Sequence, residues 1–137
     1  INEVVKIVIN YNDCFWGDST LEKIKKYDDP RITVICNEKN RGLGAVRNIG
    51  IERATGEYVT FVDTDDYVEK TWAEKLYNVA KENDADMAVC GFERIDLNTN
   101  KVVSQNMTNF GRVVKTIDGK NDFTLFINPA PWNKIYT

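Results

Sequence analysis

The stretch "AVRNIGIERATGEYVTFVDTDD" (residues 45–66) decides the fold. Its first half has the apolar spacing of a short helix that closes at a Thr-Gly pair, and its second half is an apolar, β-branched strand. Three carboxylates, Asp63, Asp65 and Asp66, follow this strand at once. A helix that leads into an apolar strand is typical of an α/β protein with a parallel sheet.

The segments on either side continue the alternation of strands and helices. We expect strands at residues 4–9, 32–36, 57–62 and 87–91, and helices at residues 18–27, 45–54 and 69–83. Ser19 and Glu22 have the spacing of a capping box for the first helix. This order predicts right-handed βαβ units and a mostly parallel sheet flanked by helices.

Beyond Phe92 the alternation becomes weaker. We expect a turn at residues 97–100, short strands within 101–104 and 111–117, and a brief helix at 122–127. No linker separates these segments from the rest. The sequence therefore predicts one domain over residues 1–137, with 92–137 as appended strands and loop.

Composition excludes several classes of function. Apolar residues make up 42% of the 137 residues and charged residues 28%, which is typical of a globular domain. The net charge of −3 and the lack of a basic patch predict no nucleic-acid partner. The absence of histidine excludes Cys/His zinc sites and histidine-dependent triads. Three separated cysteines, Cys14, Cys36 and Cys90, indicate reduced core thiols of a cytosolic protein.

The carboxylates after the third strand suggest a metal site. Ligands of open α/β sheets bind beyond the carboxyl ends of the strands. In an extended segment Asp63 and Asp65 would face one way, and two carboxylates about 4–5 Å apart repel by roughly 3–4 kcal/mol at an effective dielectric near 20. Mg²⁺ or Mn²⁺ would offset this repulsion. The alternative is that these residues, with Asp66, cap the following helix or occupy its first turn.

Two further segments carry candidate binding residues. The stretch "NRGLGAVRN" (residues 40–48) places two glycines before a helix with Arg47 and Asn48 in its first turn. Such a helix start favours an anion, which an arginine can bind through two hydrogen bonds. Asp13 follows the first strand and could accept hydrogen bonds from a base or ribose. A solvated Arg47 and a turn-forming Asp13 are the alternatives.

The stretch "RGLGAVRNIGIERATGEYVTFVDTDDYVE" (residues 41–69) resembles the nucleotide-sugar half of family 2 glycosyltransferases, which have the Rossmann-like GT-A fold. Their pattern is Gly-x-x-x-Ala-Arg-Asn-x-Gly, then Ala-x-Gly-Glu-Tyr, then an acidic D-x-D-D at a strand end. "WNKIY" (residues 132–136) is also usual in bacterial polysaccharide members. Val46 replaces the usual alanine, and Cys14 stands where the family's N-D-G-S-T-D element has glycine.

The resemblance implies a role for each candidate residue. Asp65 would bind the Mg²⁺ or Mn²⁺ that bridges the donor's diphosphate. Asp63 would lie beside it, close to ribose or metal, and Asp66 would complete the acidic edge as a further metal-site residue. Asp13 would contact the uracil or other base, and Arg47 would lie near the nucleotide or diphosphate.

The resemblance also implies the reaction. A sugar would move from a nucleotide-diphosphate donor, a UDP-sugar, to a saccharide acceptor in surface polysaccharide synthesis. This would take place in the cytoplasm, with peripheral membrane association at the inner face by analogy. The family's first βα unit and its C-terminal acceptor part, which supplies the general base, are expected to be missing here. Asp118 and Asp122 are explained as loop and helix-cap residues.

Two other functions are compatible with the residues. A catalytically silent nucleotide-sugar-binding domain would need no general base. A phosphoacceptor or phosphatase domain would also keep acidic residues at strand ends. No feature of the sequence indicates an oligomeric state.

Overall fold

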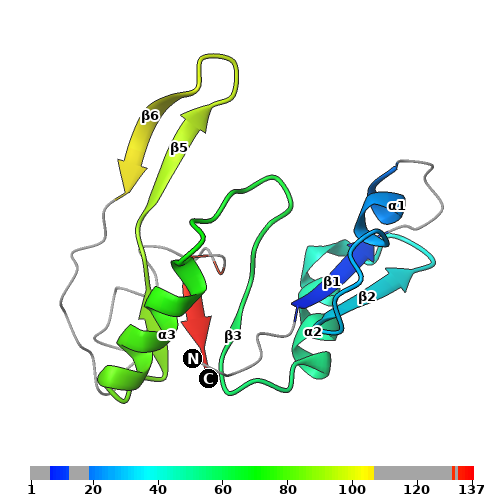
Figure 1. Ribbon diagram of the computed structural model, residues 1–137, viewed down its shortest axis with the longest axis horizontal. Coiled ribbons are helices and arrows are strands. Elements are labelled where there is room, and N and C mark those ends of the chain that lie inside the picture. Colours follow the sequence, from blue (N-terminus) through cyan, green and yellow to red (C-terminus); the bar gives the residue numbers. More distant parts are fainter. Residues whose placement is uncertain (1–6, 13–18, 107–130, 132) are drawn as a thin grey trace. The chain divides into compact units, whose positions relative to one another are not determined.

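The computed structural model describes residues 7–12, 19–106, 131 and 133–137 (Figure 1). The strand predicted within 111–117, the helix predicted at 122–127 and the candidate Asp13 lie outside the described residues. The chain divides into two compact units, unit 1 (Ile1–Glu57) and unit 2 (Tyr58–Thr137). That residues 1–137 form one domain stays a prediction.

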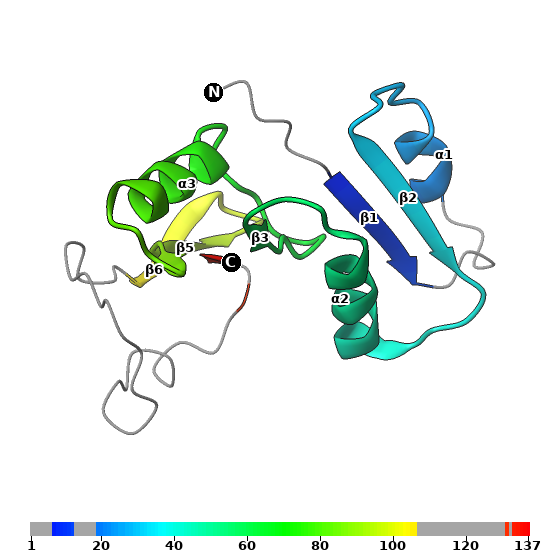
Figure 2. The same ribbon diagram turned by 90° about the horizontal axis from the view of Figure 1, so that it is seen from below.

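Unit 1 contains a parallel pair of strands. β1 (Ile7–Asn12) pairs with β2 (Ile32–Asn37) in continuous register, from Ile7 opposite Ile32 to Asn12 opposite Asn37. The connection between them contains α1 (Thr20–Ile24), and α2 (Gly42–Arg53) contacts β1 (Figure 2). The predicted parallel pairing is confirmed for these two strands, because the intervening helix returns the chain to the same end of the sheet.

The helix starts in unit 1 differ from the prediction. Ser19 is the N-cap residue of α1, but its side chain makes no capping hydrogen bond, so the expected capping box is wrong. The helix begins instead with a backbone bond from the Lys23 N–H to the Ser19 carbonyl, 3.0 Å long. α2 begins at Gly42, three residues earlier than expected, and thereby includes both glycines of the expected loop.

The turn before β2 is fixed by an ion pair. The Asp29 carboxylate accepts hydrogen bonds from the Arg31 backbone N–H (2.9 Å), from Nε (2.9 Å) and from Nη2 (2.6 Å). These bonds, first those from the Arg31 side chain, lower the pKa of Asp29 to about 2. Asp29 and Arg31 therefore close the turn around Pro30 by charge-assisted hydrogen bonds.

Unit 2 is built on a three-stranded sheet in the order β3 (Val59–Thr60), β7 (Lys134–Tyr136), β4 (Met87–Val89). β7 is antiparallel to both neighbours, so β3 and β4 run in the same direction but do not touch. The prediction of a mostly parallel sheet is therefore wrong for unit 2. Its physical reason is that a strand from the end of the chain supplies hydrogen bonds to both β3 and β4.

One face of this sheet is covered by α3 (Trp72–Glu82). Leu76 and Ala80 of α3 pack with Ala88 of β4 and Ile135 of β7, and each of the four is at most 5% exposed. Leu76 and Ala80 lie four residues apart, which is the spacing of one helix face. The helical pattern expected for residues 69–83 is thus confirmed, although the helix begins three residues later.

Tyrosines extend this core. The rings of Tyr58 and Tyr77 meet edge to face, with centroids 5.8 Å apart. The Tyr58 hydroxyl donates a hydrogen bond of 3.1 Å to the Ala85 carbonyl, which connects β3 to the loop after α3. Partly buried tyrosines of this kind combine apolar contact with a satisfied hydroxyl.

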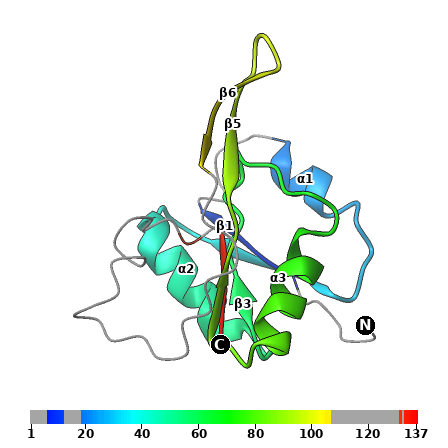
Figure 3. The same ribbon diagram turned by 90° about the vertical axis from the view of Figure 1, so that its left-hand side faces the viewer.

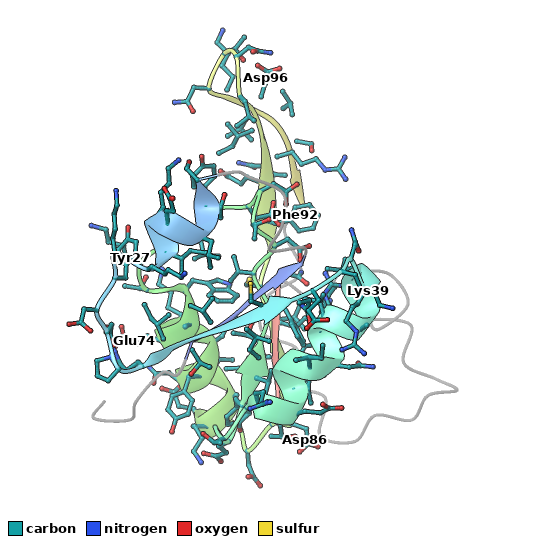
Figure 4. The ribbon with its side chains drawn as sticks, turned by 90° about the vertical axis from the view of Figure 1, so that its right-hand side faces the viewer. Tyr27, Lys39, Glu74, Asp86, Phe92 and Asp96 are labelled. Carbon is teal, nitrogen blue, oxygen red and sulfur yellow. The ribbon has the colours of Figure 1, made fainter. Side chains whose placement is uncertain are left out.

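A β-hairpin follows the core sheet. β5 (Phe92–Asp96), which the sequence did not predict, pairs antiparallel with β6 (Lys101–Asn106). The predicted turn at residues 97–100 is confirmed: Asp96 Oδ1 accepts backbone bonds from Asn98 and Thr99, and Asn100 has φ 53°. The hairpin extends away from α3 and β7 (Figure 3), with Phe92 at its base and Asp96 at its tip (Figure 4).

The two described cysteines, Cys36 and Cys90, differ in oxidation state. Cys36 at the end of β2 is disulfide-bonded, whereas Cys90 after β4 is free and half-buried. The expectation of three reduced core thiols is therefore wrong. In the part of the chain that the structure describes, no helix has the length and apolar character to cross a membrane.

Candidate functional site

The three carboxylates lie on a tight turn, residues 63–66, which we call the acidic turn. It follows β3 after two residues without assigned pairing, and the Asp66 N–H donates a hydrogen bond of 3.0 Å to the Asp63 carbonyl. Thr64 and Asp65 form the middle of the turn. The expected extended segment is therefore wrong, because residues 63–66 form a turn, and that Asp63 and Asp65 face one way stays a prediction.

Within the acidic turn, the charges of Asp63 and Asp65 act on Asp66. Asp63 is half-buried, while Asp65 and Asp66 are exposed. Loss of hydration, and then the negative charges of Asp65 and Asp63, raise the pKa of Asp66 above its usual value. The charges of Asp65 and Asp63 thus make ionisation of Asp66 less favourable, and a cation at the turn would relieve this repulsion.

The acidic turn is not a helix cap. α3 begins at Trp72 with Thr71 as its N-cap residue, and the acidic residue of its first turn is Glu74. A separate backbone bond of 2.9 Å, from the Trp72 N–H to the Glu69 carbonyl, precedes the helix. The alternative in which Asp63, Asp65 and Asp66 serve α3 as caps or first-turn acids is therefore wrong.

The carboxylate oxygens of the acidic turn suit a hard cation that a bound substrate also coordinates. The described residues contain no group of three or more His, Cys, Asp or Glu side chains arranged to hold a metal ion. Mg²⁺ and Mn²⁺ prefer oxygen ligands, and Mg²⁺ is commonly bound by one or two carboxylates together with water and substrate phosphates. The acidic turn fits such a shared site rather than an all-protein cage.

The second candidate segment lies at the start of α2. Gly42 has φ +76°, which favours glycine, and its N–H donates a hydrogen bond of 2.9 Å to Asn40 Oδ1. Because α2 begins at Gly42, Arg47 and Asn48 lie in its second turn, not in the first turn that the sequence predicted. Arg47 is half-buried.

The structure groups some of the candidate residues and not others. An open depression of α2 is lined by Asn48, Ile51 and Glu52, so it includes Asn48 of the second candidate segment but neither Arg47 nor the acidic turn. Arg47 belongs to unit 1 and the acidic turn to unit 2. The three carboxylates of the acidic turn are therefore the predicted site residues that the structure brings together.

Sequence reasoning missed a polar cluster at the edge of the unit 2 sheet. The Cys90 N–H donates to the Asn133 carbonyl (2.9 Å), and Asn133 Nδ2 donates to the Cys90 carbonyl (2.8 Å). Lys134 Nζ donates to Asn133 Oδ1 (2.8 Å), and burial lowers the pKa of Lys134. The signal was present in "WNKIY", but nothing local indicated which strands it joins.

Comparison with known proteins identifies the family to which this chain belongs. Residues 6–135 match the family described as Glycosyl transferase family 2. The chain is 30% identical over 131 residues to the "Putative glycosyltransferase EpsH" of Bacillus subtilis, which is 95% of this chain and 37% of that protein. It is 33% identical over 111 residues to the "Poly(ribitol-phosphate) beta-glucosyltransferase" of Bacillus spizizenii, or 79% of this chain and 17% of that protein.

A further relative has a different named substrate. The chain is 42% identical over 76 residues to the "Cholesterol galactosyltransferase" of Borreliella burgdorferi, which is 55% of this chain and 21% of that protein. The chain therefore spans well under half the length of each of these three relatives.

Proposed function

The chain belongs to glycosyl transferase family 2, and we propose that it forms the donor site of an enzyme that transfers a sugar from a nucleotide diphosphate to a saccharide acceptor. The observation that carries the proposal is the acidic turn: three carboxylates at the carboxyl end of β3, none of which caps α3. Family membership also decides against the phosphoacceptor and phosphatase alternatives.

Asp65 and Asp63 would hold a divalent cation in this site, with Asp66 completing the acidic edge. Mg²⁺ or Mn²⁺, when bound, would act as a Lewis acid that offsets negative charge on the departing nucleoside diphosphate. Exposed Asp65 is accessible to such a ligand, and half-buried Asp63 is held at the end of β3. Loss of hydration, and then the charges of Asp65 and Asp63, raise the pKa of Asp66.

The remaining donor contacts are assigned by the family pattern. Arg47 would bind the nucleotide or diphosphate through its guanidinium group, which suits phosphate oxygens. Asp13 would accept hydrogen bonds from the base, and UDP-sugar is the donor that we propose. One relative is named a poly(ribitol-phosphate) beta-glucosyltransferase, which supports a role in surface polymer synthesis. We place this reaction in the cytoplasm, at the inner face of the membrane.

Calorimetric titration of UDP, with and without Mn²⁺, tests the donor site. We expect Mn²⁺-dependent binding by the native chain and at least about a tenfold loss of affinity in Asp65→Asn, because one ligand charge disappears. Asp84→Asn is the matched control: Asp84 is exposed in the same unit, and its φ of 50° is one that asparagine tolerates.

The outcomes separate the hypotheses. UDP binding that is indifferent to Mn²⁺ and to Asp65→Asn would refute the assignment of the acidic turn. Sugar release from a UDP-sugar that depends on an added saccharide would distinguish an enzyme from a silent nucleotide-sugar-binding domain.

A further inference from the structure

A disulfide-bonded cysteine lies where β1 and β2 end side by side. In the parallel register Tyr11 lies opposite Cys36, and Asn12 lies opposite Asn37, the last residue of β2 (Figure 2). Ligands of open α/β sheets bind beyond the carboxyl ends of the strands. Asp13, the residue that we propose for contact with the base, follows Asn12 directly in the sequence. Cys36 therefore belongs to the edge of unit 1 at which a nucleotide is expected.

The two described cysteines also differ in accessibility. Cys36 is exposed, whereas the free Cys90 is half-buried and its thiol donates a bond of 3.5 Å to the Asn133 carbonyl. Cys14, the remaining cysteine of the sequence, lies outside the described residues. Exposed disulfides are more readily reduced than structural ones, and the readily reduced disulfides are the regulatory or catalytic ones. The position of Cys36 therefore leaves its sulfur open to attack by a thiol.

The compartment that we propose for the reaction favours the regulatory alternative. Cytoplasmic thiols keep cysteines reduced, and the disulfides that do form there are usually transient and either catalytic or redox-sensing. Transfer of a sugar from a nucleotide diphosphate to a saccharide oxidises neither substrate, so the reaction has no step for a disulfide. A redox-sensing role is then the one that fits an exposed disulfide in this place.

We propose that the disulfide of Cys36 is a reversible redox switch, which in its oxidised form holds the carboxyl-terminal edge of the β1–β2 pair ready for the nucleotide. The inference rests on the proposed function. A cross-link removes conformations from the segments that it joins, so the oxidised chain loses less conformational entropy when a ligand binds at this edge. Reduction restores those conformations and weakens binding.

Exchange with a dithiol would operate the switch. A thiolate of the dithiol attacks one sulfur of the disulfide, which breaks the S–S bond and forms a mixed disulfide, and the second thiol of the dithiol then displaces the protein sulfur. The dithiol gives up two electrons and two protons and becomes a disulfide. The protein gains two thiols, one of which is Cys36. An oxidised dithiol of the same class reverses the exchange.

Calorimetric titration of UDP in the presence of Mn²⁺ tests the switch. The native chain is measured oxidised, and again after treatment with a dithiol that is removed before the titration. We expect UDP affinity to be at least about fivefold lower in the reduced chain. Cys36→Ser should show the lower affinity with and without this treatment. Cys90→Ser is the matched control and should respond as the native chain does, because Cys90 is free.

A reciprocal measurement on the native chain covers the case in which Cys36→Ser does not fold. If the oxidised chain binds UDP more tightly, UDP must favour the disulfide by the same factor. The chain is equilibrated in glutathione buffers of graded ratio with Mn²⁺, with and without UDP, and its free thiols are counted by alkylation and mass spectrometry. We expect UDP to move the midpoint to a more reducing ratio. A disulfide that serves stability alone would lower the Tm on reduction but would show no such movement.

The contrary results are distinct. UDP affinity that is equal in the two states, or higher in the reduced chain, would overturn the inference and leave the proposed function intact. A disulfide that stays closed at the reducing glutathione ratio of the cytoplasm would also overturn the inference. A native chain that binds UDP in neither state would refute the proposed function and the inference together.

Discussion

The described side chains of units 1 and 2 make different kinds of contact. The four buried hydrophobic residues among the described side chains, which do not include those of β1, belong to unit 2, where α3 covers β4 and β7. In unit 1 the residue classed as buried among the described side chains is Asn37, which is polar. Unit 1 instead has a disulfide-bonded Cys36 and the Asp29–Arg31 ion pair. Among the described residues, unit 2 thus shows apolar burial between helix and sheet, and unit 1 shows a cross-linked cysteine and a local charge pair.

The largest effect is expected from the core of unit 2. Ile135→Ala removes a 5% exposed side chain from β7 and should lower the free energy of unfolding by about 2–5 kcal/mol, because it leaves a cavity between sheet and helix. Urea denaturation followed by circular dichroism measures the change. Val103→Ala is the control, because Val103 is 65% exposed on β6. Equal effects of the two substitutions would contradict the role given to apolar burial in unit 2.

The second effect concerns the cross-link in unit 1. Cys36→Ala should cost about 2–4 kcal/mol of stability, since a disulfide restricts the unfolded chain. Cys90→Ala removes a free thiol that donates only a long bond of 3.5 Å to the Asn133 carbonyl, and it should cost less. Thermal unfolding with and without a thiol reductant checks this. A native chain whose Tm does not respond to the reductant would contradict the role given to the disulfide.

The smallest effect is a dependence on pH in unit 1. The pKa of Asp29 is lowered from 3.8 to about 2 in the folded chain, so the ionised form stabilises the native state. This contribution is present above pH 3.8 and is lost as the pH falls from 3.8 through about 2. Because the pair is solvent-exposed, the change should be small.

Urea midpoints measured between pH 4.5 and pH 2 in about half-unit steps test this pH dependence. Asp29→Asn should flatten the acid slope slightly, and Asp28→Asn, one residue away in an exposed position, should leave it as in the native chain. Identical slopes in all three proteins would show that the ion pair has no effect on stability.

Much of the local structure could be predicted from the sequence. β2 was predicted within one residue, because its β-branched run is bounded by turn residues. α3 was recognised from its apolar spacing, and the turn at residues 97–100 from its asparagines. The acidic turn was also recognised as a candidate site, because its carboxylates directly follow an apolar strand.

Helix starts and side-chain directions were less predictable. α2 begins three residues before the expected start, and this moves Arg47 into the second turn. Thr64 and Asp65 form a turn where the sequence predicted an extended segment. Backbone hydrogen bonds such as that from Asp66 to Asp63 decide these details, and sequence periodicity does not report them.

The sequence by itself determined the order of most elements, the family pattern and the carboxylates at the end of β3. Only the tertiary structure decided that β7 lies between β3 and β4 and that Lys134 is buried. The Thr60–Lys134 hydrogen bond joins residues 74 positions apart. A three-residue strand has too little pattern to identify its partners, so its place is fixed by hydrogen bonding and burial in the folded chain.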